Sequence, residues 1–115
     1  MTLSDVVKLL KAKVMTENAD LSAECYRACG ADLMSDVLAF SKDKSILLTG
    51  LMNIQVVRTA EMMDIKTIIF VRGKIATPEI ISLAKEMEIT ILCTDYPLYE
   101  ACGILYSKGL GNVEE

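Results

Sequence analysis

Seven residues that could contact an anion follow three apolar segments in the second half of the chain. Each lies in a short polar stretch directly after a run of apolar residues. They are Gly50, Asn53, Arg72, Gly73, Lys74, Thr94 and Asp95. Arginine and lysine hold phosphate or carboxylate groups, and a backbone N–H beside a glycine can approach an anion closely. The sequence therefore predicts a candidate nucleotide- or anion-binding site, provided that the three stretches meet in the folded chain.

Four of these residues also have a purely structural interpretation. Gly50 can let the chain turn from a strand into a helix. Arg72 and Lys74 can lie in a solvated loop, and Asp95 can cap the helix that Pro97 opens. Neither G-x-G-x-x-G nor G-x-x-x-x-G-K-[ST] is present. One carboxylate without a partner base, nucleophile or metal is not a catalytic site, so we name no catalytic residue and expect no enzyme activity.

Four cysteines are the candidates for metal or redox chemistry. If residues 22–29 are extended, the sulfurs of Cys25 and Cys29 lie roughly 13 Å apart, which is too far for one zinc ion. Cys93 ends an apolar run and Cys102 lies on an apolar helix stripe, where free cysteine acts as a small hydrophobic residue. Cys25 and Cys29 remain weak metal candidates, but we predict no metal and no cofactor.

The composition excludes several classes of function. The chain has no histidine, which removes Ser-His and Cys-His nucleophile pairs and His-ligated zinc. Twelve cationic and sixteen acidic residues give a net charge of −4 with no basic cluster, which argues against nucleic acid and anionic membranes as partners. No secretory signal or membrane-spanning run is present, so we expect a cytoplasmic protein with reduced thiols.

The elements that must position the seven residues form a regular pattern from residue 45 onward. Apolar runs rich in β-branched residues over 45–49, 67–71 and 89–93 predict buried strands. Amphipathic helices are expected behind Asn53, behind Thr77, and from Pro97 to near Gly109. Strands that start about every 22 residues leave room for one crossover helix each, which predicts three adjacent parallel strands. Ligands bind at the carboxyl ends of such strands, where the seven residues fall.

The first 44 residues give a less regular pattern. Thr2 and Asp5 predict a capping box at the start of a short helix. Residues 13–16 can be extended, and residues 21–29 can pair back or run beside them. Ser35 or Asp36 can cap a further helix that ends in the polar residues 41–44. The fold class predicted is thus α/β, a three-layer sandwich with a mainly parallel sheet, an N-terminal helix and short strands, in a single domain over residues 1–115.

The order and spacing of several short segments resemble a known family. These are Ala31-Asp32-Leu33-Met34-Ser35-Asp36-Val37, Thr49-Gly50, Val71-Arg72-Gly73, Pro78-Glu79 and Ala84-Lys85-Glu86. Together they are similar to a stand-alone DRTGG domain, and the later segments also resemble the N-terminal domain of HPr kinase/phosphorylase. Where the family's name motif has Gly-Asp-Arg, this chain has Gly50-Leu51-Met52, and where it has Thr-Gly-Gly, this chain has Val71-Arg72-Gly73. Only Gly50 and Gly73 carry over, although Arg72 can supply a cation from a neighbouring position.

The resemblance implies a compact α/β domain with a regulatory role, found alone or attached to phosphate acetyltransferases and CBS-domain pyrophosphatases, where it can contribute to dimerisation. Genes of some small relatives lie near those of iron hydrogenases and histidine kinases, which implies an accessory or signalling partner. We expect a non-catalytic regulatory or accessory domain that forms a homodimer and acts through protein contact. The alternatives are a small-ligand sensor that binds a nucleotide or anion at the strand ends, and a cysteine-dependent metal or redox protein.

Overall fold

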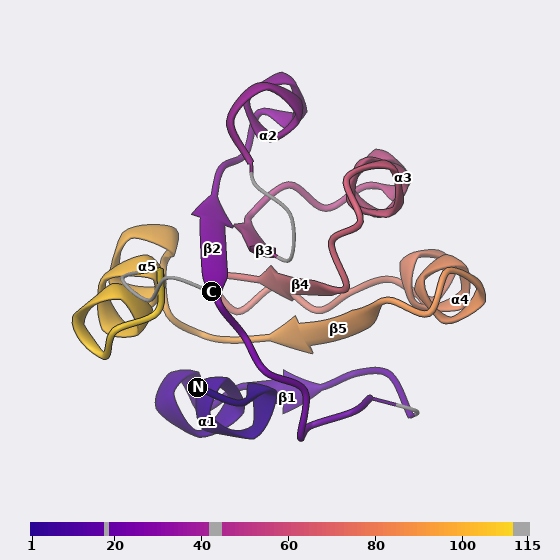
Figure 1. Ribbon diagram of the computed structural model, residues 1–115. Coiled ribbons are helices and arrows are strands. Elements are labelled where there is room, and N and C mark those ends of the chain that lie inside the picture. Colours follow the sequence, from indigo (N-terminus) through magenta and orange to yellow (C-terminus); the bar gives the residue numbers. More distant parts are fainter. Residues whose placement is uncertain (18, 42–44, 112–115) are drawn as a thin grey trace.

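A computed structural model describes residues 1–17, 19–41 and 45–111 of the chain. Its centre is a five-stranded sheet with the order β1-β5-β4-β3-β2 (Figure 1). The strands are β1 (Lys13–Val14), β2 (Arg27–Gly30), β3 (Ser45–Thr49), β4 (Thr67–Phe70) and β5 (Thr90–Cys93). Strands β2 to β5 are parallel, and β1 pairs antiparallel with β5. The three adjacent parallel strands expected after residue 45 are therefore confirmed.

Helices cover both faces of this sheet. The helices are α1 (Leu3–Leu10), α2 (Met34–Phe40), α3 (Ile54–Met62), α4 (Pro78–Glu86) and α5 (Leu98–Ser107). Figure 1 shows α1 and α5 on one face and α2, α3 and α4 on the other. The predicted three-layer α/β sandwich is confirmed. No helix in the described part of the chain is long and apolar enough to span a membrane.

The central strands separate two hydrophobic cores because alternate side chains of a strand point to opposite faces. Leu47, Ile68 and Ile91 face α3 and α4, whereas Leu48 and Ile69 belong to the core under α1 and α5. All five side chains are fully buried. Burial on both faces explains why these strands appear in the sequence as continuous apolar runs, and it leaves the strand ends as the places for polar side chains.

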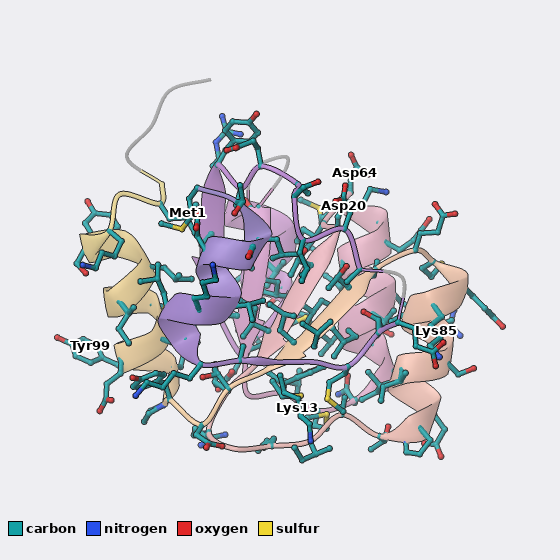
Figure 2. All side chains as sticks on the ribbon, turned by 90° about the horizontal axis from the view of Figure 1, so that it is seen from below. Met1, Lys13, Asp20, Asp64, Lys85 and Tyr99 are labelled. Carbon is teal, nitrogen blue, oxygen red and sulfur yellow. The ribbon has the colours of Figure 1, made fainter. Side chains whose placement is uncertain are left out.

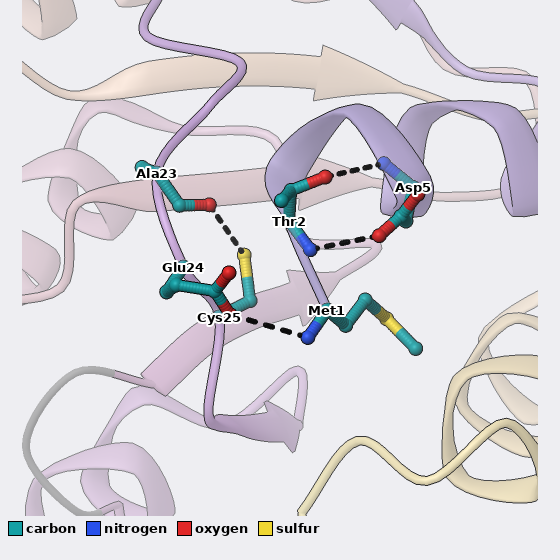
Figure 3. A network of polar contacts seen from close by, with 6 residues as sticks. All are labelled: Met1, Thr2, Asp5, Ala23, Glu24 and Cys25. Atoms are coloured by element: carbon teal, nitrogen blue, oxygen red, sulfur yellow. Dashed lines mark hydrogen bonds and ion pairs between the residues drawn. The ribbon is translucent and has the colours of Figure 1, made fainter.

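The capping box at the start of α1 is present as the sequence predicts (Figure 3). The Asp5 backbone N–H donates to Thr2 Oγ1 at 3.2 Å, and the Thr2 N–H donates to Asp5 Oδ2 at 2.9 Å. Close by, the Met1 amino group pairs with Glu24 Oε2 at 3.2 Å. The beginning of α1 is thereby tied to the segment that precedes β2.

The possibility that residues 21–29 pair with residues 13–16, which the sequence left open, is wrong. Strand β2 lies at the opposite edge of the sheet from β1, parallel to β3. The preceding segment instead satisfies backbone N–H groups at the start of α1, because Leu3 N donates to Ala23 O at 2.9 Å and Ser4 N to Leu21 O at 2.8 Å. These N–H groups have no partner inside their own helix, so they bind carbonyl groups of residues 21–23. The chain then continues to the far edge of the sheet.

The predicted cap of α2 is also wrong. The helix begins at Met34, with Leu33 as its N-cap residue and no side-chain hydrogen bond there. Ser35 and Asp36, the residues expected to cap it, lie inside the first turn. The nearest preceding carboxylate, that of Asp32, is bonded to another loop instead. Residues 42–44, expected in the polar end of this helix, lie outside the described residues.

Candidate functional site

The carboxyl ends of β3 and β4 bring the first two predicted stretches together around Gly50. Lys74 Nζ donates a hydrogen bond to Gly50 O at 2.7 Å. The Arg72 guanidinium lies against the same glycine, since a Cβ built on Gly50 would be 2.8 Å from Arg72 Nη2. Both cationic side chains are exposed to solvent. We call this region the rim: Asp32, Thr49, Gly50, Arg72, Gly73, Lys74 and Asp95.

Gly50 lies against the Arg72 guanidinium and does not serve the turn that the sequence suggested. It does not adopt a positive φ, in contrast to Gly73 at 71°. The turn from β3 therefore does not need the conformational freedom of glycine at position 50. A side chain there would instead occupy the space of the Arg72 guanidinium. Gly50 is a point of close approach between two loops. The sequence alone does not distinguish such a glycine from one that is needed for a turn.

Asp32 is a rim residue that is absent from the seven site residues predicted from the sequence. Its Oδ1 accepts hydrogen bonds from Gly50 N at 2.7 Å and from Thr49 Oγ1 at 3.2 Å. Asp32 follows β2 just as Gly50 follows β3. Had residues 27–30 been recognised as a fourth parallel strand, the same strand-end rule would have placed Asp32 on the rim.

Arg72 has an unusual backbone conformation. Its φ is 63°, in the left-handed region that favours glycine, and Gly73 follows at 71°. The turn is held from the β5 side, where Arg72 N donates to Tyr96 O at 2.9 Å and Gly73 N to Thr94 O at 3.0 Å. Left-handed backbone costs a non-glycine residue roughly 1–2 kcal/mol. These two hydrogen bonds fix the direction in which the Arg72 side chain leaves the loop.

The remaining predicted site residues lie near the rim but have other partners. Asn53 caps α3, since its side-chain oxygen accepts from Val56 N at 3.2 Å. The buried Thr94 hydroxyl donates to Leu10 O at 2.7 Å and accepts from Tyr96 N at 3.3 Å, so it links the sheet to α1. The Asn53 side chain therefore acts as a cap and the Thr94 hydroxyl as an internal link.

One structural interpretation of the sequence made Asp95 the cap of α5, but Asp95 does not cap this helix. The N-cap residue of α5 is Pro97, which makes no side-chain cap bond, so Asp95 lies two residues too early. Its exposed carboxylate lies beside Gly73, where a built Cβ would be 3.4 Å from Asp95 Oδ1. Asp95 therefore adds a negative charge to the rim next to the Arg72 turn.

The four cysteines are free thiols distributed between the two cores. Cys25 belongs to the core under α1 and α5, whereas Cys29 packs against the core under α3 and α4. Burial raises the pKa of Cys25 to about 11, and it also raises the pKa values of Cys29, Cys93 and Cys102. Protonated thiols are poor nucleophiles and poor metal ligands. Within the residues that the structure describes, no group of three or more Cys, Asp or Glu side chains could hold a metal ion.

A second surface, on α5 and β2, exposes aromatic side chains. Tyr99 is 89% exposed and Tyr106 is 65% exposed, and Figure 2 shows Tyr99 pointing away from the body of the molecule. Beside them lies an open hollow of about 520 Å³. Its lining includes Ala28 and Gly30 of the edge strand β2 and Gly103 of α5. We call this surface the α5–β2 face.

Comparisons with known proteins agree with this fold. The model of the DRTGG domain family matches residues 5–107. A solved structure, the CBS and DRTGG domains of the regulatory region of Clostridium perfringens pyrophosphatase complexed with its activator diadenosine tetraphosphate, is similar over 99% of this chain with a TM-score of 0.77 and 20% identity. The match covers 50% of that structure's chain. No curated protein matches the sequence.

The family match spans nearly all of the described fold, from α1 to the end of α5. It confirms the resemblance that the sequence segments indicated. The solved pyrophosphatase region that shares this fold is described as regulatory in that protein. The chain belongs to the DRTGG domain family.

Proposed function

We propose that the protein is a non-catalytic regulatory module that forms a homodimer and acts through protein contact in the cytoplasm. The observation that carries this proposal is the α5–β2 face, where two exposed tyrosines flank an open hollow beside an edge strand. Exposed aromatic side chains around a hollow are typical of protein contact surfaces. The whole chain, residues 1–115, would act as one unit.

The chemistry of α5 favours a second copy of the chain as the occupant. Tyr99, Gly103 and Tyr106 are spaced i, i+4 and i+7, so they form one stripe along the helix. Nothing lies within 4 Å of a Cβ built on Gly103, so a partner helix can approach closely at the middle of the stripe. Exposed Glu100 lies near the start of α5, and exposed Lys108 follows its end. Two copies packed antiparallel about Gly103 would place each glutamate near the other copy's lysine.

Light scattering at tens of micromolar protein tests the homodimer. We expect the wild-type mass to be that of two chains and the Tyr106→Glu variant to have the mass of one chain, because a carboxylate in the buried contact is desolvated without a partner. Met62→Glu is the matched control, since Met62 on α3 has the same exposed fraction of 65%. This control should remain a dimer.

A wild-type mass of one chain would contradict the homodimer. Dissociation by Met62→Glu but not by Tyr106→Glu would instead place the contact on the α3 side and contradict the surface that we propose.

A second candidate function is a small-ligand sensor that binds the phosphate group of a nucleotide at the rim. Two exposed cations from one loop converge on Gly50, which supports this candidate. Within the described residues neither Arg72 nor Lys74 forms an ion pair with a carboxylate, so both charges face solvent without a contacting counter-charge. The structurally similar pyrophosphatase region was solved with a nucleotide activator, which makes nucleotides the first ligands to try.

Thermal and urea unfolding with added ATP test the sensor. A ligand at a hundredfold excess over its dissociation constant stabilises the folded state by about 2.7 kcal/mol. We expect ATP to stabilise the wild type and the Arg58→Ala control, which removes an exposed arginine from α3. Arg72→Ala should lose the effect. An unchanged midpoint for the wild type at millimolar ATP would contradict the sensor.

A further inference from the structure

The Asp32 carboxylate occupies the position at the rim that suits a ligand's anionic group. In open parallel sheets, ligands lie just beyond the carboxyl ends of the strands, where backbone N–H groups are available. Here one such group, Gly50 N–H, donates to Asp32 Oδ1 at 2.7 Å, and the Thr49 hydroxyl donates to the same oxygen at 3.2 Å. A carboxylate oxygen of the protein thus makes the contacts that a phosphate oxygen would make.

The local structure of Asp32 does not require this contact. The following helix, α2, has no side-chain cap, although Asp32 directly precedes its N-cap residue Leu33. The backbone is fixed independently, since Ala31 N donates to Leu48 O at 3.1 Å. Asp32 is exposed to solvent. Its side chain can therefore rotate away from Gly50 into water while the main chain stays in place.

The two cations lie around the same peptide but leave Asp32 unpaired. Lys74 Nζ donates to Gly50 O at 2.7 Å, and Arg72 Nη2 lies over Gly50, yet neither forms an ion pair with Asp32 in the described structure. One carboxylate carries one charge and two oxygens. A terminal phosphate carries about two charges and three oxygens, so it can accept from Gly50 N–H and still approach both cations.

We propose that Asp32 is an internal competitor for the rim: its carboxylate fills the anion position, and the terminal phosphate of a nucleotide binds by displacing it toward solvent. This inference rests on the proposed ligand site and adds its regulation. In the absence of nucleotide, the carboxylate satisfies Gly50 N–H and repels other anions. Nucleotide must overcome both effects, so the wild-type rim responds only at a concentration that Asp32 helps to set.

Removing the Asp32 charge should therefore tighten nucleotide binding. Asp32→Asn keeps the size of the side chain and an oxygen that accepts from Gly50 N–H, but it removes the repulsion between carboxylate and phosphate. A unit charge close to the phosphate at the protein surface corresponds to an affinity change of about tenfold. Asp36→Asn is the matched control, because it makes the same charge change four residues away in the first turn of α2.

Isothermal titration calorimetry with ATP, inorganic triphosphate and adenosine tests the proposal. We expect ATP and triphosphate to bind Asp32→Asn about tenfold more tightly than wild type, while Asp36→Asn binds as wild type does. Adenosine should not show the difference, because it has no phosphate. Asp32→Ala should also bind the phosphate ligands more tightly, and its folding is checked by urea unfolding with and without triphosphate.

The outcomes distinguish failure of the competitor role of Asp32 from failure of the ligand site itself. If wild type binds ATP and Asp32→Asn binds it with equal or lower affinity, the competitor role is overturned and the ligand site stands. A tenfold gain that appears equally in Asp36→Asn would also overturn it, since only net charge would then matter. No heat from ATP or triphosphate with wild type, Asp32→Asn and Asp32→Ala at millimolar concentration would overturn both the competitor and the ligand site.

Discussion

Arg72 carries a full side chain in a backbone conformation that favours glycine, with a φ of 63°. Such conformations persist where surrounding contacts over-determine them, and they often occur at functional sites. Here Tyr96 O and Thr94 O accept the N–H groups of Arg72 and Gly73, and these contacts hold the turn. The guanidinium is thereby directed across the loop onto Gly50. The residue that the proposed sensor needs most is thus also the residue whose backbone is most strained at the rim.

Rim residues could be predicted from the sequence only where a recognisable apolar strand pattern preceded them. Gly50 follows the apolar run 45–49, Arg72 and Lys74 follow the run 67–71, and the structure brings the three residues into contact. Asp32 follows a four-residue edge strand of which Ala28 and Gly30 are exposed, so no apolar run marked it. Edge strands lack burial on one side, and for this reason their sequence signal is weak.

The buried thiol of Cys25 predicts a stability that falls in alkaline solution. Burial raises the pKa of Cys25 to about 11 in the folded protein, from an ordinary value of 9.0. The unfolded chain therefore loses this proton first, so the contribution is present below about pH 9 and is lost as pH rises toward 11. Urea unfolding of wild type and Cys25→Ala across this range should show a steeper decline for wild type.

The difference between the two proteins should be smaller than about 2.7 kcal/mol, the full value of a two-unit pKa shift, because solvent partly screens the thiolate. All other ionisable groups are common to both proteins, so their contributions cancel in the comparison. Parallel pH profiles would show that Cys25 ionises equally in the folded and unfolded chains, contrary to its burial.

At the scale of elements, β3, β4 and β5 and the helices between them were predictable because each signal is local. Asn53 and Thr77 cap α3 and α4 as expected, and Pro78 stands at the start of α4. The position of β2 was not predictable, since it depends on contacts of residues 21–25 with the start of α1. Nothing in the pattern of residues 21–29 itself distinguishes one sheet edge from the other.

The capping box of α1 is an element-scale prediction. Thr2→Ala removes the side chain that accepts from Asp5 N, and we expect the free energy of unfolding to fall by about 1 kcal/mol. Ser4→Ala is the control on the same helix and should leave stability nearly unchanged. Urea unfolding near neutral pH measures both.

The contribution of the capping box to stability should depend on pH, and the sign of this dependence follows from the pKa of Asp5. Hydrogen bonds from the Thr2 backbone and side chain lower the pKa of Asp5 from its ordinary value of 3.8. The Asp5 contribution is therefore present above about pH 4 and is lost as pH falls below it. The gap in the free energy of unfolding between wild type and Asp5→Ala, which removes the carboxylate that accepts from Thr2 N, should therefore narrow in acid. A constant gap would show that the carboxylate takes no part in the box.

At the scale of the whole molecule, the rim and the α5–β2 face share one connection. Gly30 lines the hollow of the α5–β2 face, and Asp32 reaches Gly50 on the rim only two residues later. Ala31 between them is hydrogen-bonded to β3. A ligand that displaced Asp32 would therefore act next to the proposed contact surface, which would give the proposed module a short physical route between its two sites.

Amide spectra of ¹⁵N-labelled protein, recorded by two-dimensional NMR over a series of dilutions, test the central claim most directly. If the chain is a module that works through a self-contact, the amides that shift on dilution should lie in α5 and β2, while those of α3 and α4 stay in place. Shifts centred on α3 and α4 would contradict the proposed surface. Spectra that do not change, in a protein whose mass by light scattering is that of one chain, would contradict the claim itself.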